Sequence, residues 1–138
     1  MQIEHTFLID NDRTTNFLNQ YLLLKYGSFG RIHKFNSCME VVSYLEKYHA
    51  NFQQNLSVLF LEIHMPSMDG WELLINLKRL RLKYALNVKV IILSTTAETW
   101  FYRRRLQFEF IVAWVKKPLS QEKLNTILNR QRLLRLKS

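Results

Sequence analysis

Five apolar runs of strand length recur along the chain. They cover residues 5–10, 31–35, 57–62, 88–94 and 110–115. Three of the runs are apolar at almost every position, which is typical of strands that are covered on both faces of a sheet. We therefore predict five β-strands at these positions.

The segments between the runs carry helix-start signals. Three capping boxes, each a polar residue followed three positions later by glutamate, stand ahead of apolar residues at helical spacing. They are Ser37 with Glu40, Asp69 with Glu72, and Thr95 with Glu98. The third box predicts a helix through residues 100–108. Ser120 can cap a last helix that contains Leu124 and Ile127.

A first helix is expected directly after the first strand, with Asp12 as its cap. Its residues Phe17, Tyr21 and Leu24 recur at helical spacing, so we expect them to face the core. Gly27 is expected to end this helix, because glycine readily takes the left-handed conformation found at helix ends. Strands and helices thus alternate along the chain.

Five β–α units in succession predict an α/β fold with a doubly wound parallel sheet. Parallel strands need helical crossovers, and these cover both faces of the sheet. Ligands of such sheets bind at the carboxyl ends of the strands. The residues that follow the strands are therefore the candidates for function.

Length and composition fit a single domain over residues 1–138. The chain is 48% hydrophobic and 22% charged, which excludes collagen-like and disordered classes. Its one cysteine, Cys38, excludes an internal disulfide and a cysteine-based zinc site. The sequence shows neither a signal peptide nor an apolar run of membrane-spanning length, so we expect a soluble, cytoplasmic protein.

The formal net charge of +9 is unevenly distributed. Residues 1–69 have 5 basic and 7 acidic side chains, a net charge of −2, whereas residues 70–138 have 15 basic and 4 acidic side chains, a net charge of +11. This asymmetry favours a surface that binds an acidic partner.

Polar residues with related chemistry follow four of the predicted strands. They are Asp10, Asn11 and Asp12 after the first strand, Glu62 at the third, Ser94 at the fourth and Lys117 after the fifth. Carboxylates suit a hard cation such as Mg²⁺, while a lysine and a hydroxyl suit phosphoryl oxygens. We therefore expect a site for Mg²⁺ and a phosphoryl group at this edge of the sheet.

Four segments follow one another in a characteristic order: FLIDND at 7–12, MPSMDGWELL at 65–74, VIILS at 90–94 and VKKPL at 115–119. Together they resemble the receiver domain of two-component response regulators, the family with the chemotaxis-regulator fold. The resemblance implies a (βα)5 flavodoxin-like sheet with strand order 2-1-3-4-5. It also implies a stand-alone receiver in phosphorelay signalling that binds a histidine kinase or another signalling protein and is not an enzyme.

The same resemblance assigns roles to residues at the strand ends. Glu62 stands at the phosphoacceptor position, Ser94 at that of the switch hydroxyl, and Lys117 at that of the family's lysine. Trp114 corresponds to the aromatic residue that changes rotamer on activation. The bond between Lys117 and Pro118 would be cis, which proline permits.

The implied Mg²⁺ ligands are Asp10, Asn11, Glu62 and the backbone carbonyl of His64. Two of these positions depart from the family, which has aspartate in place of Glu62 and a second acid in place of Asn11. Glutamate carries its carboxylate about 1.5 Å further out, where it could contact Ser94 and Lys117 directly and mimic the activated state. The amide at position 11 weakens Mg²⁺ binding.

We favour the hypothesis that this is a pseudo-receiver, fixed in one state by Glu62 and active through protein–protein interaction. The alternative within the family is a receiver that still accepts a phosphoryl group, inefficiently. In both cases Mg²⁺ is a possible but weakened cofactor.

A second function class fits part of the same sequence. Residues 10–14 read D-x-D-x-T after a strand, which resembles the nucleophile motif of haloacid-dehalogenase-type phosphatases. Asp10 would be the covalent nucleophile and Asp12 the general acid/base, with Ser94 and Lys117 in the remaining roles. This alternative leaves residues 65–70 unexplained, and the chain lacks the acidic cluster that such phosphatases have after their lysine.

The basic half includes the run Arg103, Arg104 and Arg105. In receivers the fourth helix, fifth strand and fifth helix form the output and dimerisation face, so these arginines and Trp114 are expected to belong to it. A homodimer would form through this face. The sequence contains no recognisable DNA-reading module, so nucleic acid would bind only non-specifically, through its phosphates.

Overall fold

The computed structural model describes residues 3–63, 70–95 and 105–129. The strands are β1 (Ile3–Ile9), β2 (Arg31–Phe35), β3 (Leu56–Leu61), β4 (Val88–Ser94) and β5 (Ile111–Lys116). The helices of the described ranges are α1 (Arg13–Tyr26), α2 (Cys38–Lys47), α3 (Gly70–Tyr84) and α5 (Gln121–Asn129), with two short 3-10 helices, η1 (His49–Phe52) and η2 (Arg105–Gln107).

The five strands form one parallel sheet in the order β2-β1-β3-β4-β5. This confirms the predicted α/β class and the strand order that the resemblance implied. β2 and β4 have the predicted bounds, and the other three differ from prediction by at most two residues at either end. Because all five strands are parallel, their carboxyl ends meet at one edge of the sheet.

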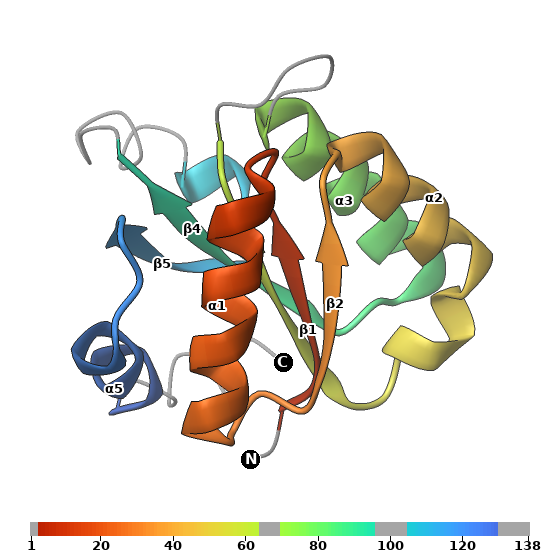
Figure 1. Ribbon diagram of the computed structural model, residues 1–138. Coiled ribbons are helices and arrows are strands. Elements are labelled where there is room, and N and C mark those ends of the chain that lie inside the picture. The colour runs from red at the N-terminus through yellow and green to blue at the C-terminus, as the bar shows by residue number, and fades with distance from the viewer. Residues whose placement is uncertain (1–2, 64–69, 96–104, 130–138) are drawn as a thin grey trace.

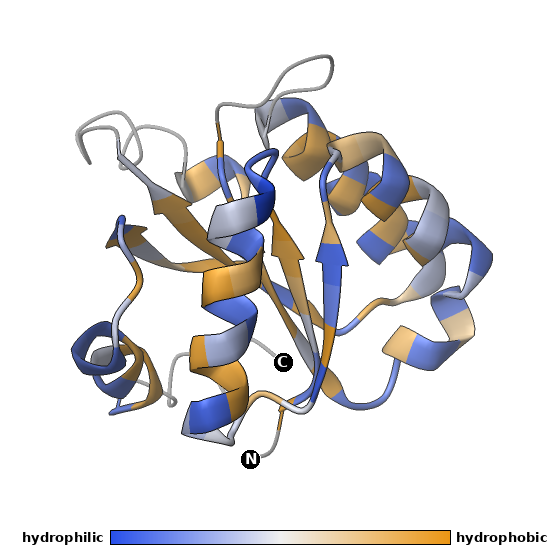
Figure 2. Ribbon diagram, viewed as in Figure 1, coloured by the Kyte–Doolittle hydropathy of each residue, from blue (hydrophilic) through white to orange (hydrophobic). Residues whose placement is uncertain are grey.

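Helices cover both faces of the sheet (Figure 1). One core lies between the sheet and helices α2 and α3, where Phe7, Leu59 and Val90 meet Val41 and Leu77. A second core lies on the other face, under α1 and α5. Strands β3, β4 and β5 are hydrophobic along most of their length, the edge strand β2 is mostly hydrophilic, and the helices alternate between hydrophobic and hydrophilic positions (Figure 2). This distribution agrees with a sheet that is buried on both faces.

Several helix starts follow the predicted capping chemistry. Ser37 accepts a hydrogen bond from the Glu40 backbone N–H at 3.3 Å, and Ser120 accepts one from the Lys123 backbone N–H at 3.2 Å. These contacts satisfy backbone donors at the start of α2 and α5. The boxes at 69–72 and 95–98 include residues outside the described ranges. Most of the helix predicted over 100–108 also lies outside them, and residues 105–107 of that segment form η2.

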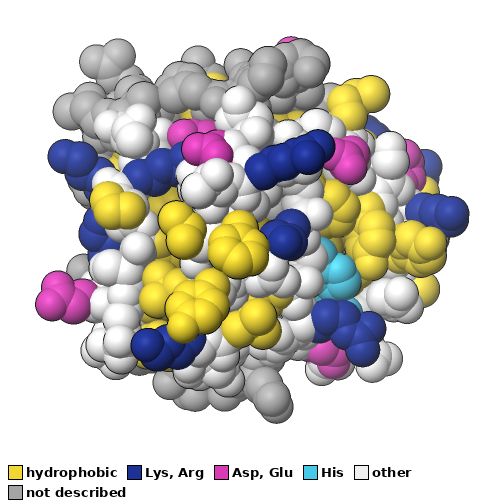
Figure 3. Space-filling model, viewed as in Figure 1, with side chains coloured by type: hydrophobic (Ala, Val, Ile, Leu, Met, Phe, Trp, Pro, Cys, Tyr) yellow, Lys and Arg dark blue, Asp and Glu magenta, His cyan; other side chains and the backbone are white. Residues whose placement is uncertain are grey.

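The predicted orientation of α1 is wrong. Phe17, Tyr21 and Leu24 are 61%, 62% and 61% exposed. The buried residues of this helix are Asn16, Asn19 and Leu23. Position 16 faces the sheet because its amide binds backbone carbonyls there, and the next position then points about 100° away. With Leu18, the three exposed residues form the α1 strip, and Figure 3 shows hydrophobic side chains gathered over this helix.

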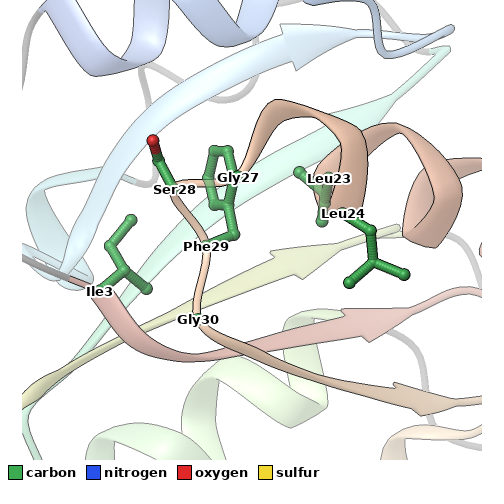
Figure 4. A pocket seen from close by; sticks show the side chains of 7 residues that line it. All are labelled: Ile3, Leu23, Leu24, Gly27, Ser28, Phe29 and Gly30. Carbon is green, nitrogen blue, oxygen red and sulfur yellow. The ribbon is translucent and has the colours of Figure 1, made fainter.

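Two glycines shape the turn between α1 and β2 (Figure 4). Gly27 ends α1 as predicted, with φ +88° and a hydrogen bond from its N–H to the Leu23 carbonyl at 3.0 Å. Gly30 has φ +63°, and a Cβ at this position would lie 2.2 Å from the Glu4 carbonyl oxygen. The turn lines a cavity of about 350 Å³ beside Ile3. Because Ile3 begins β1, the cavity lies at the edge of the sheet opposite the strand ends that bind ligands.

A histidine pair, which the sequence did not reveal, joins β1 to the edge strand β2. His5 Nδ1 and His33 Nε2 are 3.0 Å apart, within hydrogen-bonding distance. The His33 ring stacks on Phe7, with 5.0 Å between ring centroids. Burial lowers the pKa of His33, and the nearby His5 and Arg31 lower it further. The folded protein therefore favours the neutral form of His33.

None of the helices within the described ranges combines the length and apolar character that a membrane span requires.

Replacing Gly30 with alanine should lower the free energy of unfolding by more than about 2 kcal/mol, because the added Cβ meets the β1 backbone at a positive φ. Gly27→Ala is the matched control. No atom lies within 4 Å of its Cβ position, so only the left-handed penalty of about 1 kcal/mol remains. Urea denaturation measures both variants, and equal losses would contradict the described turn.

Lowering the pH from about 7 to about 5 should destabilise the protein through His33. A histidine whose pKa is lower in the folded state stabilises the protein at pH values above its unfolded pKa. As the pH falls below that value, the unfolded state binds a proton before the folded state does, and this stability is lost. His33→Phe keeps an aromatic ring but cannot titrate. Its free energy of unfolding should therefore fall less over this range than that of the wild type, and parallel pH profiles would contradict the account.

Candidate functional site

The polar residues after the strands meet at the carboxyl edge of the sheet. The backbone fixes their positions: the Glu62 N–H donates to the Ile9 carbonyl at 3.1 Å, and the Lys117 N–H donates to the Ser94 carbonyl at 3.0 Å. Each of these residues lies at or directly after the end of its strand. The parallel register thus places β1, β3, β4 and β5 to supply one site.

Lys117 bridges two carboxylates at the centre of this site. Its Nζ lies 2.6 Å from Asp10 Oδ2 and 3.1 Å from Glu62 Oε1. Asp10 is 4% exposed and Glu62 is 8% exposed. Two buried carboxylates in one site repel each other and are poorly solvated, so the ammonium group between them stabilises the arrangement.

The remaining oxygen of each carboxylate binds a backbone N–H group. Glu62 Oε2 accepts from the Ile63 N–H at 2.8 Å, and Asp10 Oδ1 accepts from the Asp12 N–H at 2.9 Å. All four carboxylate oxygens therefore have partners from the protein itself. Charge-assisted contacts of this kind are stronger than neutral hydrogen bonds.

The pKa of Lys117 is raised above its usual value. Burial on its own would lower this pKa, but hydrogen bonds and charge attraction from Asp10 and Glu62 outweigh the effect of burial. The side chain is therefore fully charged at neutral pH.

Asp12 and Asn11 stand apart from this bridge. The Asp12 carboxylate caps α1 and accepts from the backbone N–H groups of Thr14 at 2.9 Å and Thr15 at 3.4 Å. A hydrogen bond from the Thr15 hydroxyl, together with these backbone bonds, lowers the pKa of Asp12. Asn11 is exposed. Asp12 therefore acts as the predicted helix cap.

Asn16, a buried residue of α1, supports the site, and sequence reasoning did not assign it this role. Its side-chain amide donates to the carbonyls of Asp10 at 3.1 Å and Phe35 at 2.9 Å. It thereby ties the ends of β1 and β2 to α1. The available signal was Asn16 itself, a polar residue within the predicted first helix. The apolar residues Phe17, Tyr21 and Leu24 instead indicated a different inward face for that helix.

The other predicted site residues have different outcomes. Ser94 is fully buried at the end of β4. Trp114, on β5, is half-buried and packs against the core under α2 and α3. His64, Arg103 and Arg104 lie outside the described residues. Arg105 begins η2, and only its backbone is described.

The described residues fit a Mg²⁺ ion poorly. Across the ranges 3–63, 70–95 and 105–129, no group of three or more His, Cys, Asp or Glu side chains is arranged to hold a metal. The two carboxylates of the site already share the Lys117 ammonium. A divalent cation would have to displace this ammonium or share these carboxylate oxygens with it.

The lysine–proline bond after β5 is cis, as the resemblance implied. This peptide follows the residue that bridges the carboxylates.

Comparison with known proteins identifies the family. The family model described as the response regulator receiver domain matches residues 6–129. No curated protein matches the sequence at a significant level. The phosphatase alternative finds no support, since the family match covers the segment that it left unexplained, and Asp12, its proposed acid/base, caps α1.

Solved structures agree with the family match. A two-component response regulator from Cytophaga hutchinsonii is 25% identical, with a TM-score of 0.80 over 94% of this chain and 97% of that one. A receiver protein from Dyadobacter fermentans is 21% identical, with a TM-score of 0.76 over 92% and 96%. The chemotaxis protein CheY4 from Vibrio cholerae is 19% identical, with a TM-score of 0.71 over 93% and 98%. The chain therefore belongs to the response regulator receiver domains of two-component signalling.

Proposed function

We propose that this chain is a pseudo-receiver: a receiver domain that no longer cycles through phosphorylation and that acts as a binding module, not as an enzyme. The observation that carries the proposal is the contact of 3.1 Å between Glu62 Oε1 and the Lys117 ammonium. With its extra methylene, Glu62 carries its carboxylate further out than aspartate would, nearer the position at which relatives carry a phosphoryl group.

The partners of Glu62 support this interpretation. A phosphoryl group needs cationic and N–H donors around its oxygens. The Glu62 carboxylate takes one donor of each kind, the Lys117 ammonium and the Ile63 backbone N–H. Because Glu62 is covalently fixed, this pairing does not depend on a kinase.

The same geometry disfavours phosphoryl transfer. A phosphoryl donor must approach a carboxylate oxygen in line, and a misplacement of about 1 Å can cost about 100-fold in rate. Glu62 has an extra methylene compared with aspartate, it is buried, and each of its oxygens is engaged. Attack on a donor would first require the loss of one of these contacts.

Mg²⁺ binding is weakened for a related reason. The ammonium of Lys117 supplies positive charge between the carboxylates, and Asn11 offers an amide where the family has a second acid. If present, Mg²⁺ would be held by Asp10 and Glu62 and would supply charge neutralisation. The protein's own lysine already provides much of this neutralisation.

The proposed action is contact with a histidine kinase or another signalling protein. The α1 strip supports such contact, because four large apolar side chains are exposed on the helix that begins beside the site (Figure 3). Exposed apolar patches on soluble domains commonly mark interaction surfaces. A homodimer through β5 and α5 remains a prediction.

The substitution Glu62→Asp combined with Asn11→Asp should restore phosphorylation. With acetyl phosphate and Mg²⁺, the shorter Asp carboxylate would form a bond to phosphorus while acetate departs with the electron pair of the broken P–O bond. Intact-mass spectrometry should show one added phosphoryl group in the double variant and none in the wild type. Asn11→Asp alone is the control and should stay unmodified. A Mg²⁺-dependent adduct on Glu62 of the wild type would contradict the proposal.

Replacing Lys117 with methionine should lower the free energy of unfolding by about 3 kcal/mol, because two buried carboxylates lose their shared counter-ion. Millimolar Mg²⁺ should recover part of this loss, since a divalent cation can take the place of the ammonium. Thermal denaturation with and without Mg²⁺ measures both effects.

The matched control for that experiment is Lys116→Met, which removes an exposed neighbouring charge and should change stability little. If Mg²⁺ stabilises the wild type as strongly as Lys117→Met, the lysine does not compete with the metal. That result would refute the proposed role of the bridge.

A further inference from the structure

The outer face of α3 carries exposed apolar and basic side chains. Ile75 is 61% exposed and Leu82 is 81% exposed. They lie two helical turns apart, with the exposed residues Lys78 and Arg79 between them. Leu106 of η2 is 90% exposed. We call these five residues the α3 strip.

Leu106 is part of the same surface because η2 is joined to α3. Lys78 Nζ donates to the carbonyl of Gln107 at 3.1 Å, and the same ammonium lies 6.0 Å from the centre of the Phe108 ring. The inner face of α3 is complete without the strip, since Leu73, Leu74, Leu77 and Leu80 are fully buried. The exposed aliphatic side chains therefore contribute little to the core.

The charge of the strip indicates the kind of partner that it can bind. Helix α3 contains four basic residues and one acidic residue, Glu72. Arg79 makes a long contact of 3.8 Å with Glu46 and donates to Asn76 Oδ1 at 3.4 Å. Arg79 and Glu46 are both about half-exposed, so the charge of Arg79 remains available to a partner. A second copy of this chain would bring like charges together. An acidic surface is the complementary partner.

The spacing of the apolar residues favours a protein over a nucleic acid. Nucleic-acid phosphates gain from the cations but gain little from Ile75 and Leu82, which flank those cations along the helix. A helix with apolar residues seven positions apart and acids between them matches both the apolar and the basic side chains of the strip. We propose that the α3 strip docks an acidic, amphipathic helical segment of a partner protein.

Two hydrogen bonds connect the start of α3, the helix that carries most of the strip, to the candidate site. The Gly70 N–H, at the start of α3, donates to the Ile63 carbonyl at 2.6 Å, and the Ile63 N–H donates to Glu62. The start of α3 thus lies one hydrogen bond and one residue away from the Glu62 side chain, and Ile75, the first strip residue on this helix, follows five positions after Gly70. This inference adds a docking surface to the proposed function and does not require phosphoryl chemistry.

Binding of a designed peptide to the full chain tests the proposal. The probe is a fluorescently labelled helical peptide with leucines seven positions apart and glutamates between them, and its affinity is measured by anisotropy. The pair Lys78→Glu and Arg79→Glu should weaken binding at least about tenfold, and the pair Ile75→Ser and Leu82→Ser should weaken it at least about fivefold. Both pairs alter exposed side chains, and thermal denaturation verifies that the variants fold.

The matched control is the pair Lys25→Glu and Lys47→Glu, which makes the same charge change at exposed positions of α1 and α2. It should change the affinity less than about twofold. The proposal is overturned if the peptide does not bind, if either strip pair binds like the wild type, or if polyglutamate binds as tightly as the peptide. Tighter binding of a DNA duplex would identify a nucleic-acid surface instead. None of these failures would affect the phosphorylation tests at Glu62.

Discussion

The arrangement of the site depends on one partly buried cation held between two buried carboxylates. Asp10 and Glu62 come from β1 and β3, whereas Lys117 comes from the end of β5. Their contacts of 2.6 Å and 3.1 Å therefore join the middle of the sheet to one side of it. Removing the ammonium would leave two like charges poorly solvated, which costs several kcal/mol in buried sites. This constraint links the stability of the carboxyl edge to its chemistry.

Under the proposed pseudo-receiver function, the position of Glu62 would set this receiver apart from one that is phosphorylated. In a phosphorylation cycle, a phosphoryl group is added to the strand-end carboxylate and removed again, and the surrounding donors respond to its position and charge. Here a side-chain anion is permanently present, and the Lys117 ammonium and the Ile63 N–H engage it. A switch needs two states that a signal can bias. A fixed carboxylate biases the site toward one of them.

The sequence predicted the features that depend on local pattern. The strand order followed from the family resemblance, and the bounds of β4 and the caps at Ser37 and Asp12 followed from apolar runs and capping residues. The orientation of α1 could not be predicted in this way. It is set by Asn16, whose amide reaches carbonyls on two other segments of the chain. The contact between His5 and His33 is also non-local, because it depends on the register of β1 and β2.

A crystal structure of the protein grown with Mg²⁺ and beryllofluoride would test the central claim most directly. Beryllofluoride binds carboxylates as a phosphoryl mimic, so it reveals whether the site can accept such a group. We expect Lys117 Nζ to remain between Asp10 and Glu62, with no beryllofluoride on Glu62. An adduct on Glu62 with Mg²⁺ beside Asp10 would contradict the account and identify a functional phosphoacceptor.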